Sequence, residues 1–327
     1  MEKFGMDVPG PGTGLRLIGR GKALNQSAFL FLVIVVLSIA IFLANPQFLS
    51  SRNLINILQQ ISVTGIVTMG MAMVLISGGI DLSVGSVISV TCSVIAKLMV
   101  SGVNVWLAVL AGMLTALACG LVNGLIISKT GCAPFIITLG TLSVFGGLAL
   151  VITSGRIVNL NGGFDLLGRT NVGFVPMPVI VFLLVCFIVF IVLNFCRFGR
   201  RLYAMGGNEE AAFLSGIYVS LLKIVIYCIN ALIVGVAALV LLSRLGSANP
   251  VMGQGYELQS IAAAVIGGVT LDGGKGSVVG CFLGVLLLGI ISNALNILGV
   301  SPFYQNMVLG SIIVIAVVVS NIGRKKR

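Results

Sequence analysis

The sequence predicts an all-α, polytopic integral membrane protein of about ten transmembrane helices, with both termini in the cytoplasm. Hydrophobic residues make up 58% of the 327 residues and charged residues only 8%, whereas about 25% of the residues of an ordinary soluble domain are charged. The chain also divides into apolar runs of about the length that a helix needs to cross a bilayer. Histidine is absent, which removes the commonest general base and metal ligand.

The first segment, residues 1–26, is polar and contains Pro9 and Pro11, so we expect it to be cytoplasmic and poorly ordered. The run at 27–44 is longer than the apolar part of a secretory signal and is expected to be an uncleaved first span. The expected membrane domain is 27–322, and a basic tail at 323–327 follows it. Eight further runs are expected to form spanning helices: 54–76, 84–100, 105–127, 133–153, 175–195, 224–243, 277–298 and 303–321.

A tenth run, 258–270, is short for a straight spanning helix, and the basic residues decide whether it crosses. If it crosses, 14 basic residues lie in cytoplasmic segments, Lys97 lies within a span, and only Arg52, Arg156, Arg169 and Arg244 lie outside. If it does not cross, the split is 9 to 9. Because Lys and Arg favour the cytoplasmic side, the sequence predicts a crossing, with irregular backbone buried in protein beside the short helix. The net charge of +11 therefore indicates membrane orientation, and no nucleic acid is expected.

The largest internal cytoplasmic segment then runs from 197 to 223 and carries the signals of a short helix. Asn208 is a good N-cap, Glu209 and Glu210 suit the positive end of the helix dipole, and Gly216 can end the helix. We expect about two helical turns, and a solvated loop is the alternative. The residues that such a helix exposes are Glu209, Glu210, Ala211 and Ala212.

Two Gly-rich loops resemble each other, SGGIDLSVGSVIS at 77–89 and IGGVTLDGGKGSVVG at 266–280. The carboxylates of Asp81 and Asp272 stand where each could cap the helix that follows. The glycines allow backbone conformations that other residues resist. Two ordinary turns are the alternative to a true repeat. The glycine pairs are Gly78 and Gly79 in the first loop and Gly267 and Gly268 in the second.

The second loop does not fit a nucleotide-binding P-loop, which needs Gly, four residues and then Gly-Lys-Ser/Thr after a strand. Gly268 and Gly273 have the right separation, but Gly274 stands where the motif requires Lys. The seven cysteines show no metal-binding spacing and are interpreted as small hydrophobic residues. Since no hydrolase motif is present either, we expect neither an enzyme nor a cofactor or metal bound by this chain.

Small and polar residues inside the spans follow a pattern of their own. Small residues at every fourth position predict seams of close helix packing; they are Ala108, Gly112, Ala116, Gly120 and Gly124, and Gly276, Gly280 and Gly284. The few amides are expected to bond between helices or to line a path for an uncharged polyhydroxy solute; they are Gln59, Gln60, Asn123, Asn230, Asn293 and Asn296. No span carries Asp or Glu near its middle, which disfavours proton coupling and leaves sodium coupling open.

Three stretches carry a resemblance to a known family: GGIDLSVGS at 78–86, GRRLYAMGGNEEAAFLSGI at 199–217 and AAAVIGGVTLDGGKGSVVG at 262–280. In order and spacing they resemble the signatures of sugar ABC-importer permeases of the ribose, xylose and galactose type. The resemblance implies a multi-pass transport subunit of the bacterial plasma (inner) membrane, which passes a monosaccharide inward by alternating access. It also implies several partners: an extracytoplasmic sugar-binding protein, a cytoplasmic ABC ATPase that holds the ATP, a second permease copy in a homodimer or related heterodimer, and membrane lipid.

In such permeases the cytoplasmic loop at 197–223 forms a coupling helix that docks in a cleft of the ATPase. The positions that the resemblance assigns to docking are Arg200, Arg201, Gly207, Asn208, Glu209, Glu210, Ala211, Ala212 and Gly216. It does not define the residues that contact the sugar. The alternatives are an ABC permease for a nucleoside, autoinducer-2 or a branched-chain amino acid, a sodium-coupled secondary transporter, and a membrane scaffold without transport.

Overall fold

The structure, a computed structural model, describes residues 15–301, 304–305, 307–308, 310–312 and 314. Within this part of the chain, seven helices are long and apolar enough to cross a bilayer. They are α1 (Leu15–Ala44), α2 (Ser51–Ile76), α4 (Val105–Thr130), α5 (Pro134–Thr153), α6 (Met177–Phe195), α9 (Val219–Leu245) and α11 (Val278–Ile297). The predicted helical membrane fold is confirmed.

The remaining elements are shorter. Two apolar helices, α3 (Val84–Val100) and α10 (Tyr256–Ile266), are accompanied by two more polar helices, α7 (Arg197–Gly207) and α8 (Glu209–Leu214). A 3₁₀ turn, η1 (Pro46–Leu49), joins α1 to α2. Four short strands form two antiparallel pairs, β1 (Val158–Asn159) with β4 (Ser247–Ala248), and β2 (Asn171–Val172) with β3 (Val175–Pro176).

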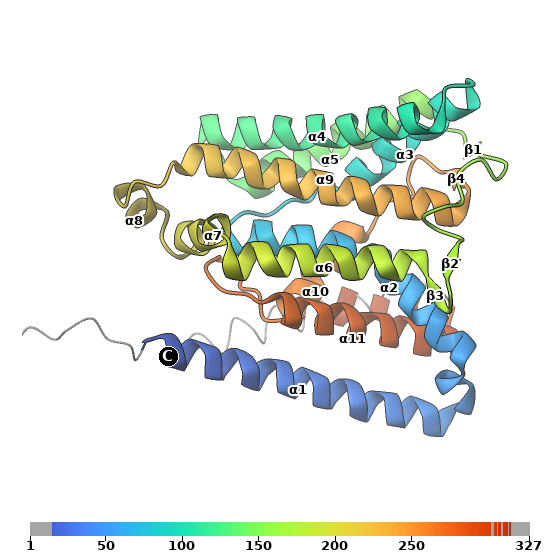
Figure 1. Cartoon of the computed structure of the whole chain (residues 1–327), viewed down its shortest axis with the longest axis horizontal. Helices are drawn as coiled ribbons and strands as arrows, with labels where there is room; N and C mark the ends of the chain where they lie inside the picture. The colour runs from blue at the N-terminus through green and yellow to red at the C-terminus, as the bar shows by residue number, and fades with distance from the viewer. Residues whose placement is uncertain (1–14, 302–303, 306, 309, 313, 315–327) are drawn as a thin grey trace, which may run out of the picture.

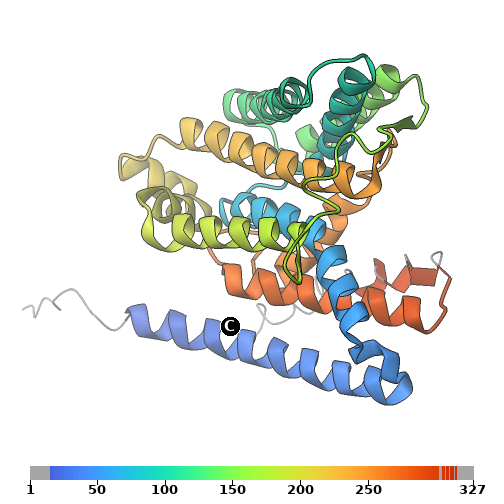
Figure 2. The same cartoon turned by 45° about the vertical axis from the view of Figure 1, so that its right-hand side comes forward.

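The long helices run side by side in a bundle with two distinct ends (Figure 1). One end carries α7 and α8 and is called the α8 end below; the other carries the strands and is called the strand end. Figure 2 shows that α1 lies along one edge of the bundle, and little of its apolar run is buried. The residues of α2 are the most buried of any spanning helix, so α2 forms the centre of the bundle.

The helix starts differ most from the predicted spans at two places. α1 begins at Leu15 instead of residue 27, because both prolines of the N-terminal segment precede that residue and nothing after them interrupts a helix. α9 begins at Val219 instead of residue 224. Residues 1–14, much of the last predicted span at 303–321 and the tail at 323–327 lie outside the described residues.

The seams of small residues pack helices closely, as predicted. A Cβ atom on Gly120 of α4 would lie 2.6 Å from the carbonyl oxygen of Tyr227 on α9, and one on Gly124 would lie 2.8 Å from the Cα atom of Ile224. Only glycine permits such an approach of two backbones. The inner amides also bond between elements: Asn123 donates to Ser83 at 2.8 Å. The predictions for both residue types are confirmed at these positions.

The two short apolar helices begin inside the bundle. Ser83, which precedes α3, is bonded to Asn123 at a point about two turns, or about 10 Å, from the end of α4. The non-helical segment before α10 also enters the bundle, because the amide of Gly253 donates to the hydroxyl of Ser89 on α3 at 3.0 Å. Irregular backbone buried beside the short helix α10 agrees with the sequence prediction.

Candidate functional site

The segment between α6 and α9 folds into two helices joined at Asn208. The side chain of Asn208 accepts a 2.9 Å hydrogen bond from the amide of Ala211 and so caps α8. The chain leaves α8 through Gly216, whose φ of 80° favours glycine, and the amide of Ile217 donates to the carbonyl of Ala212 at 3.1 Å. The predicted short capped helix is confirmed. α7 was not predicted as a separate helix.

The exposed face of α8 differs from the prediction. Glu209, Glu210 and Ala211 are exposed, and Glu209 forms a 2.7 Å ion pair with Lys223. Ala212, however, is buried and only 4% exposed. The prediction for Ala212 is wrong because the turn that follows α8 folds back on its carbonyl, which turns this side of the helix toward the protein.

Three large apolar side chains, missed at the sequence level, complete this surface. Phe213, Leu214 and Tyr218 are 67%, 79% and 83% exposed. A signal was available, because Phe213 and Leu214 follow Glu209 and Glu210 by four residues and therefore share their faces of the helix. The exposed residues form a mixed acidic and apolar patch, called the α8 surface below: Glu209, Glu210, Ala211, Phe213, Leu214 and Tyr218.

The end of α7 packs against both Gly-rich loops. A Cβ atom on Gly206 would collide with the carbonyl oxygen of Ile76, the last residue of α2. The amide of Gly274 donates to that same carbonyl at 2.8 Å, and the hydroxyl of Tyr203 donates to the carbonyl of Gly276 at 2.9 Å. Burial raises the pKa of Tyr203 to about 12, so the donor keeps its proton at neutral pH. α7 therefore contacts the segments that lead into α3 and α11.

The likeness of the two loops lies in how they end the preceding helix. α2 and α10 both finish in a residue with right-handed helical backbone, and each is followed by a glycine with positive φ, 84° at Gly78 and 92° at Gly268. The next amides, of Gly79 and Val269, donate back into the helix at 3.0 and 2.9 Å. This is a shared helix-ending turn of the Schellman type.

The cap expected from Asp272 is wrong, whereas the carboxylate of Asp81 accepts the amide of Ser83 directly before α3. Ser83 precedes α3 and Ser277 precedes α11, and the hydroxyl of Ser277 accepts from the amide of Gly280 at 3.0 Å. Five residues separate Asp272 from the start of α11, whereas two separate Asp81 from the start of α3, because the second loop is longer. Asp272 is exposed.

Asp81 lies inside the bundle, where it is 2% exposed. Its carboxylate accepts hydrogen bonds from the amide and hydroxyl of Ser83 at 3.0 and 2.6 Å and from the amide group of Asn230 on α9 at 2.8 Å. Glu257, on α10, is also buried. No span carries a carboxylate near its middle, as the sequence indicates, but Asp81 and Glu257 are buried inside the bundle. They reach its interior because they lie beside the starts of α3 and α10, which begin there.

A cavity of about 410 Å³ lies between the loops at the α8 end. It brings together six of the residues singled out from the sequence: Gly78, Gly79, Gly207, Asn208, Glu209 and Asp272. Gly267 and Gly268 do not line it, and Gly267 packs instead against Gly280 of α11. Arg200 and Arg201 line a separate basic groove on α7 together with Arg197.

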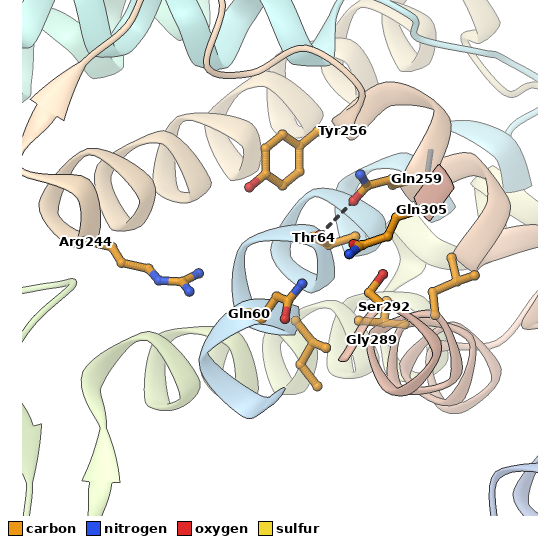
Figure 3. Close-up of a pocket in the computed structure, with 11 residues that line it drawn as sticks. Gln60, Thr64, Arg244, Tyr256, Gln259, Gly289, Ser292 and Gln305 are labelled. Atoms are coloured by element: carbon orange, nitrogen blue, oxygen red, sulfur yellow. Dashed lines mark hydrogen bonds between the residues drawn. The ribbon is translucent and has the colours of Figure 1, made fainter. Parts of the chain in front are cut away.

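A second cavity, of about 250 Å³, opens in the half of the bundle nearer the strand end (Figure 3). Among its residues the hydroxyl of Thr64 on α2 donates to the side-chain oxygen of Gln259 on α10 at 3.4 Å. Amides, hydroxyls and one guanidinium provide both donors and acceptors, which suits an uncharged polyhydroxy molecule. The polar residues of this outer polar cavity are Gln60, Thr64, Arg244, Tyr256, Gln259, Ser292 and Gln305.

Comparison with known proteins assigns these features to a family. The family model described as the permease component of the branched-chain amino acid transport system matches residues 53–317. The chain belongs to this family of permeases. The permease is therefore a transport subunit and not an enzyme, and it is a multi-pass protein of the bacterial inner membrane.

Individual relatives cover nearly the whole permease. The ribose import permease of Bacillus subtilis (strain 168) is 44% identical over 299 residues, which are 90% of this chain and 92% of the relative. The ribose import permease of Escherichia coli (strain K12) is 40% identical over 94% and 97% of the two chains. The D-allose transport system permease of Escherichia coli (strain K12) is 40% identical over 88% and 89%. No solved structure matches the permease. The resemblance to sugar-importer permeases is confirmed.

Proposed function

We propose that the permease carries a monosaccharide, with ribose as the first candidate, through the inner membrane as the spanning subunit of an ABC importer. The identity of 44% with a ribose import permease supports the solute. The observation that supports coupling to an ATPase is the capped helix α8, which presents an exposed acidic and apolar surface. Its neighbour α7 contacts both Gly-rich loops. A binding protein delivers the sugar, and ATP is hydrolysed at a separate ATPase, so this chain needs no cofactor of its own.

The proposed topology has ten crossings, with both termini and the α8 end in the cytoplasm. Its main support is the segment 249–266, which leads from the strand pair at one end to the loop beside Ile76 at the other. The interrupted segment thus covers the same distance as a spanning helix. The α8 end also collects basic residues, as cytoplasmic ends do: Lys129, Arg197, Arg200, Arg201, Lys223 and Lys275.

The α8 surface is the proposed docking site for the ATPase. A monomeric protein rarely exposes large apolar side chains side by side, and Phe213, Leu214 and Tyr218 do so beside two carboxylates. Asn208 and Gly216 set the ends of the helix, while the buried Ala212 holds it on the protein. Arg200 and Arg201 would face the ATPase or lipid phosphates from the basic groove.

Movement at α8 would reach the membrane interior through α7. Gly206 packs on the last residue of α2, and Tyr203 is bonded to the residue before Ser277 at the start of α11. The first of these loops leads into α3, and the second follows α10. Both α3 and α10 begin inside the bundle. ATP-driven displacement of α8 would thereby shift the interrupted segments and open the solute path on alternate sides. Two permease copies, identical or related, would enclose that path.

Reconstitution tests the proposed function. The permease is placed in proteoliposomes with its ATPase and binding protein, and uptake of labelled ribose is measured. We expect uptake that requires ATP and the binding protein. Uptake that continues without ATP but collapses with the sodium gradient would instead identify a secondary transporter. If the binding protein holds a nucleoside or an amino acid, that molecule is the transported solute and not ribose.

A further inference from the structure

A buried carboxylate lies where the two short apolar helices meet in the bundle. Glu257, in the first turn of α10, is only 9% exposed. A Cβ atom on Gly85 would collide with its Oε2 atom, so this oxygen lies against the first turn of α3. Gly253, just before α10, packs on the same residue. In transporters, interrupted helices that meet inside the membrane form solute sites, because they bring free polar groups to that depth.

The two oxygens of Glu257 differ in their surroundings. Oε1 accepts a 2.9 Å hydrogen bond from the amide of Gly255, which closes the start of α10 and gives this oxygen a structural role. Oε2 is buried, and within the part of the chain that the structure describes no donor lies within hydrogen-bonding distance of it. A buried carboxylate oxygen without a donor is costly. A molecule that enters the site would supply the missing hydrogen-bond donor to Oε2.

A cavity of about 350 Å³ adjoins Glu257. It lies between α3, α5 and the segment before α10, and it is called the serine cavity below after its polar residues, Ser86, Ser89, Ser143 and Gln254. Ser86 donates its hydroxyl proton to the carbonyl of Ser83 at 2.7 Å and keeps its acceptor capacity. The hydroxyl oxygen of Ser89 accepts from Gly253, so its proton is free to be donated. The cavity thus offers acceptors and donors around the carboxylate.

We propose that the serine cavity is a monosaccharide site inside the membrane, in which Oε2 of Glu257 accepts a hydrogen bond from a sugar hydroxyl. The class of solute, a monosaccharide, is taken from the proposed function, and the inference rests on it. The volume falls in the range of small-molecule pockets, about 300 to 1,000 Å³. A Cβ atom added at Gly147, in the wall that α5 provides, would meet nothing within 4 Å, so the cavity is open on this side.

The surroundings favour a sugar hydroxyl over a cation. The carboxylate lies at the N-terminus of α10, whose partial positive charge already stabilises it and would repel a cation. Among the described residues no group of three or more His, Cys, Asp or Glu side chains could hold a metal ion. A hydroxyl group donates a hydrogen bond without adding charge to the site.

The site also connects with the proposed coupling path. Tyr256 and Gln259, on either side of Glu257 in the chain, line the outer polar cavity, while Gln254 and Glu257 line the serine cavity. The first turn of α10 therefore separates the two cavities. The other end of α10 leads into the loop that α7 contacts, so a shift of that loop would move Glu257 relative to α3.

The test uses two variants and one control in the reconstituted importer. Glu257→Gln removes the charge while keeping the shape, and we expect ATP-dependent ribose uptake to fall on the order of tenfold to a hundredfold, as for a lost hydrogen bond to a charged group. Ser143→Trp fills the cavity from an exposed position of α5 and should block uptake without disturbing the fold. Asp165→Asn removes one carboxylate from a salt bridge in the segment between α5 and α6 and should transport like the parent protein. Copurification of the ATPase with each variant checks assembly.

The outcomes separate this inference from the proposed function. If the parent protein shows no ATP-dependent ribose uptake, the proposed function itself fails. If the parent transports ribose and both Glu257→Gln and Ser143→Trp match it, the serine cavity is not the sugar site. A sodium requirement that Glu257→Gln abolishes would show that the carboxylate binds a cation, and this would also overturn the inference. If Glu257→Gln does not insert, Ser143→Trp decides.

Discussion

The hydroxyl group of Tyr203 donates a 2.9 Å hydrogen bond to the carbonyl oxygen of Gly276, and this bond ties α7 to the start of α11. Replacement of Tyr203 by Phe removes only the donor. We expect the unfolding free energy to fall by about 0.5 to 1.5 kcal/mol and the sugar transported per ATP hydrolysed to fall several-fold. Parallel measurement of uptake and ATP hydrolysis in proteoliposomes checks this. Tyr304→Phe, at an exposed position, is the control. If Tyr203→Phe transports as much sugar per ATP hydrolysed as the parent protein, this bond is not part of the coupling path.

The pH dependence of the same bond follows from burial, which raises the pKa of Tyr203 to about 12. The folded pKa lies above the ordinary tyrosine value of about 10. The stabilisation is therefore complete below pH 10 and is lost as the pH rises through 12. The stability difference between the parent protein and Tyr203→Phe should thus be constant from pH 6 to pH 9. A difference that shrinks within this range, measured by thermal unfolding in detergent, would contradict the assignment.

Gly206 and Gly207 offer a matched pair for the contact between α7 and the loops. A Cβ atom on Gly206 would collide with the carbonyl of Ile76, whereas a Cβ atom on Gly207 meets nothing within 4 Å. We expect Gly206→Ala to lower the unfolding free energy by about 1 to 3 kcal/mol, as overpacking does, and Gly207→Ala to leave it nearly unchanged. Thermal unfolding of the two purified variants makes the comparison. Equal stability would mean that the loops can move aside at no cost.

The buried carboxylate of Asp81 depends on its donors. Asn230→Ala removes the 2.8 Å hydrogen bond from α9, and a hydrogen bond to a charged group contributes about 1.5 to 3 kcal/mol. We expect a loss of that size in the unfolding free energy. Asn194→Ala, which removes an exposed bond to Phe190 in α6, should cost less than about 0.5 kcal/mol. The double variant Asp81→Asn, Asn230→Ala should recover part of the loss, because no buried charge is then left without its donor.

Composition and hydrophobic runs predicted the helical membrane fold and most helix bounds, since burial in lipid requires long apolar segments. The cap of Asn208 was also predictable, because a cap depends on a few neighbouring residues. The burial of Ala212 was not, since it depends on how the following turn folds back on α8. Nor were the depths of Asp81 and Glu257. Both carboxylates flank helix starts that look like ordinary loop ends in the sequence. Asp81 lies inside through its contact with Asn230 of α9, and Glu257 through the packing of α3 against the segment before α10.

The α8 surface can be tested by charge reversal at an exposed position. Glu210 is exposed in the first turn of α8, so Glu210→Arg should leave insertion unchanged and lower the unfolding free energy by no more than about 1 kcal/mol, the contribution of a charge to the helix dipole. If the ATPase docks here, the variant should lose ATPase copurification and sugar uptake together. A partner surface that complements Glu210 is positive, and an arginine set against it places like charges together, which costs several kcal/mol. Phe213→Ser should weaken copurification through lost apolar contact.

Two further variants separate docking from folding. Ser220→Arg places the same cationic side chain at an exposed position at the start of α9, outside the α8 surface, and should copurify normally. Ala212→Arg places a cation at a buried position and should lower thermal stability as well as uptake, so it disrupts the helix rather than the interface alone. Normal copurification and uptake in both Glu210→Arg and Phe213→Ser would show that the ATPase binds elsewhere. Loss in these two variants with parent-like stability would place the partner on the face that Glu210 and Phe213 share.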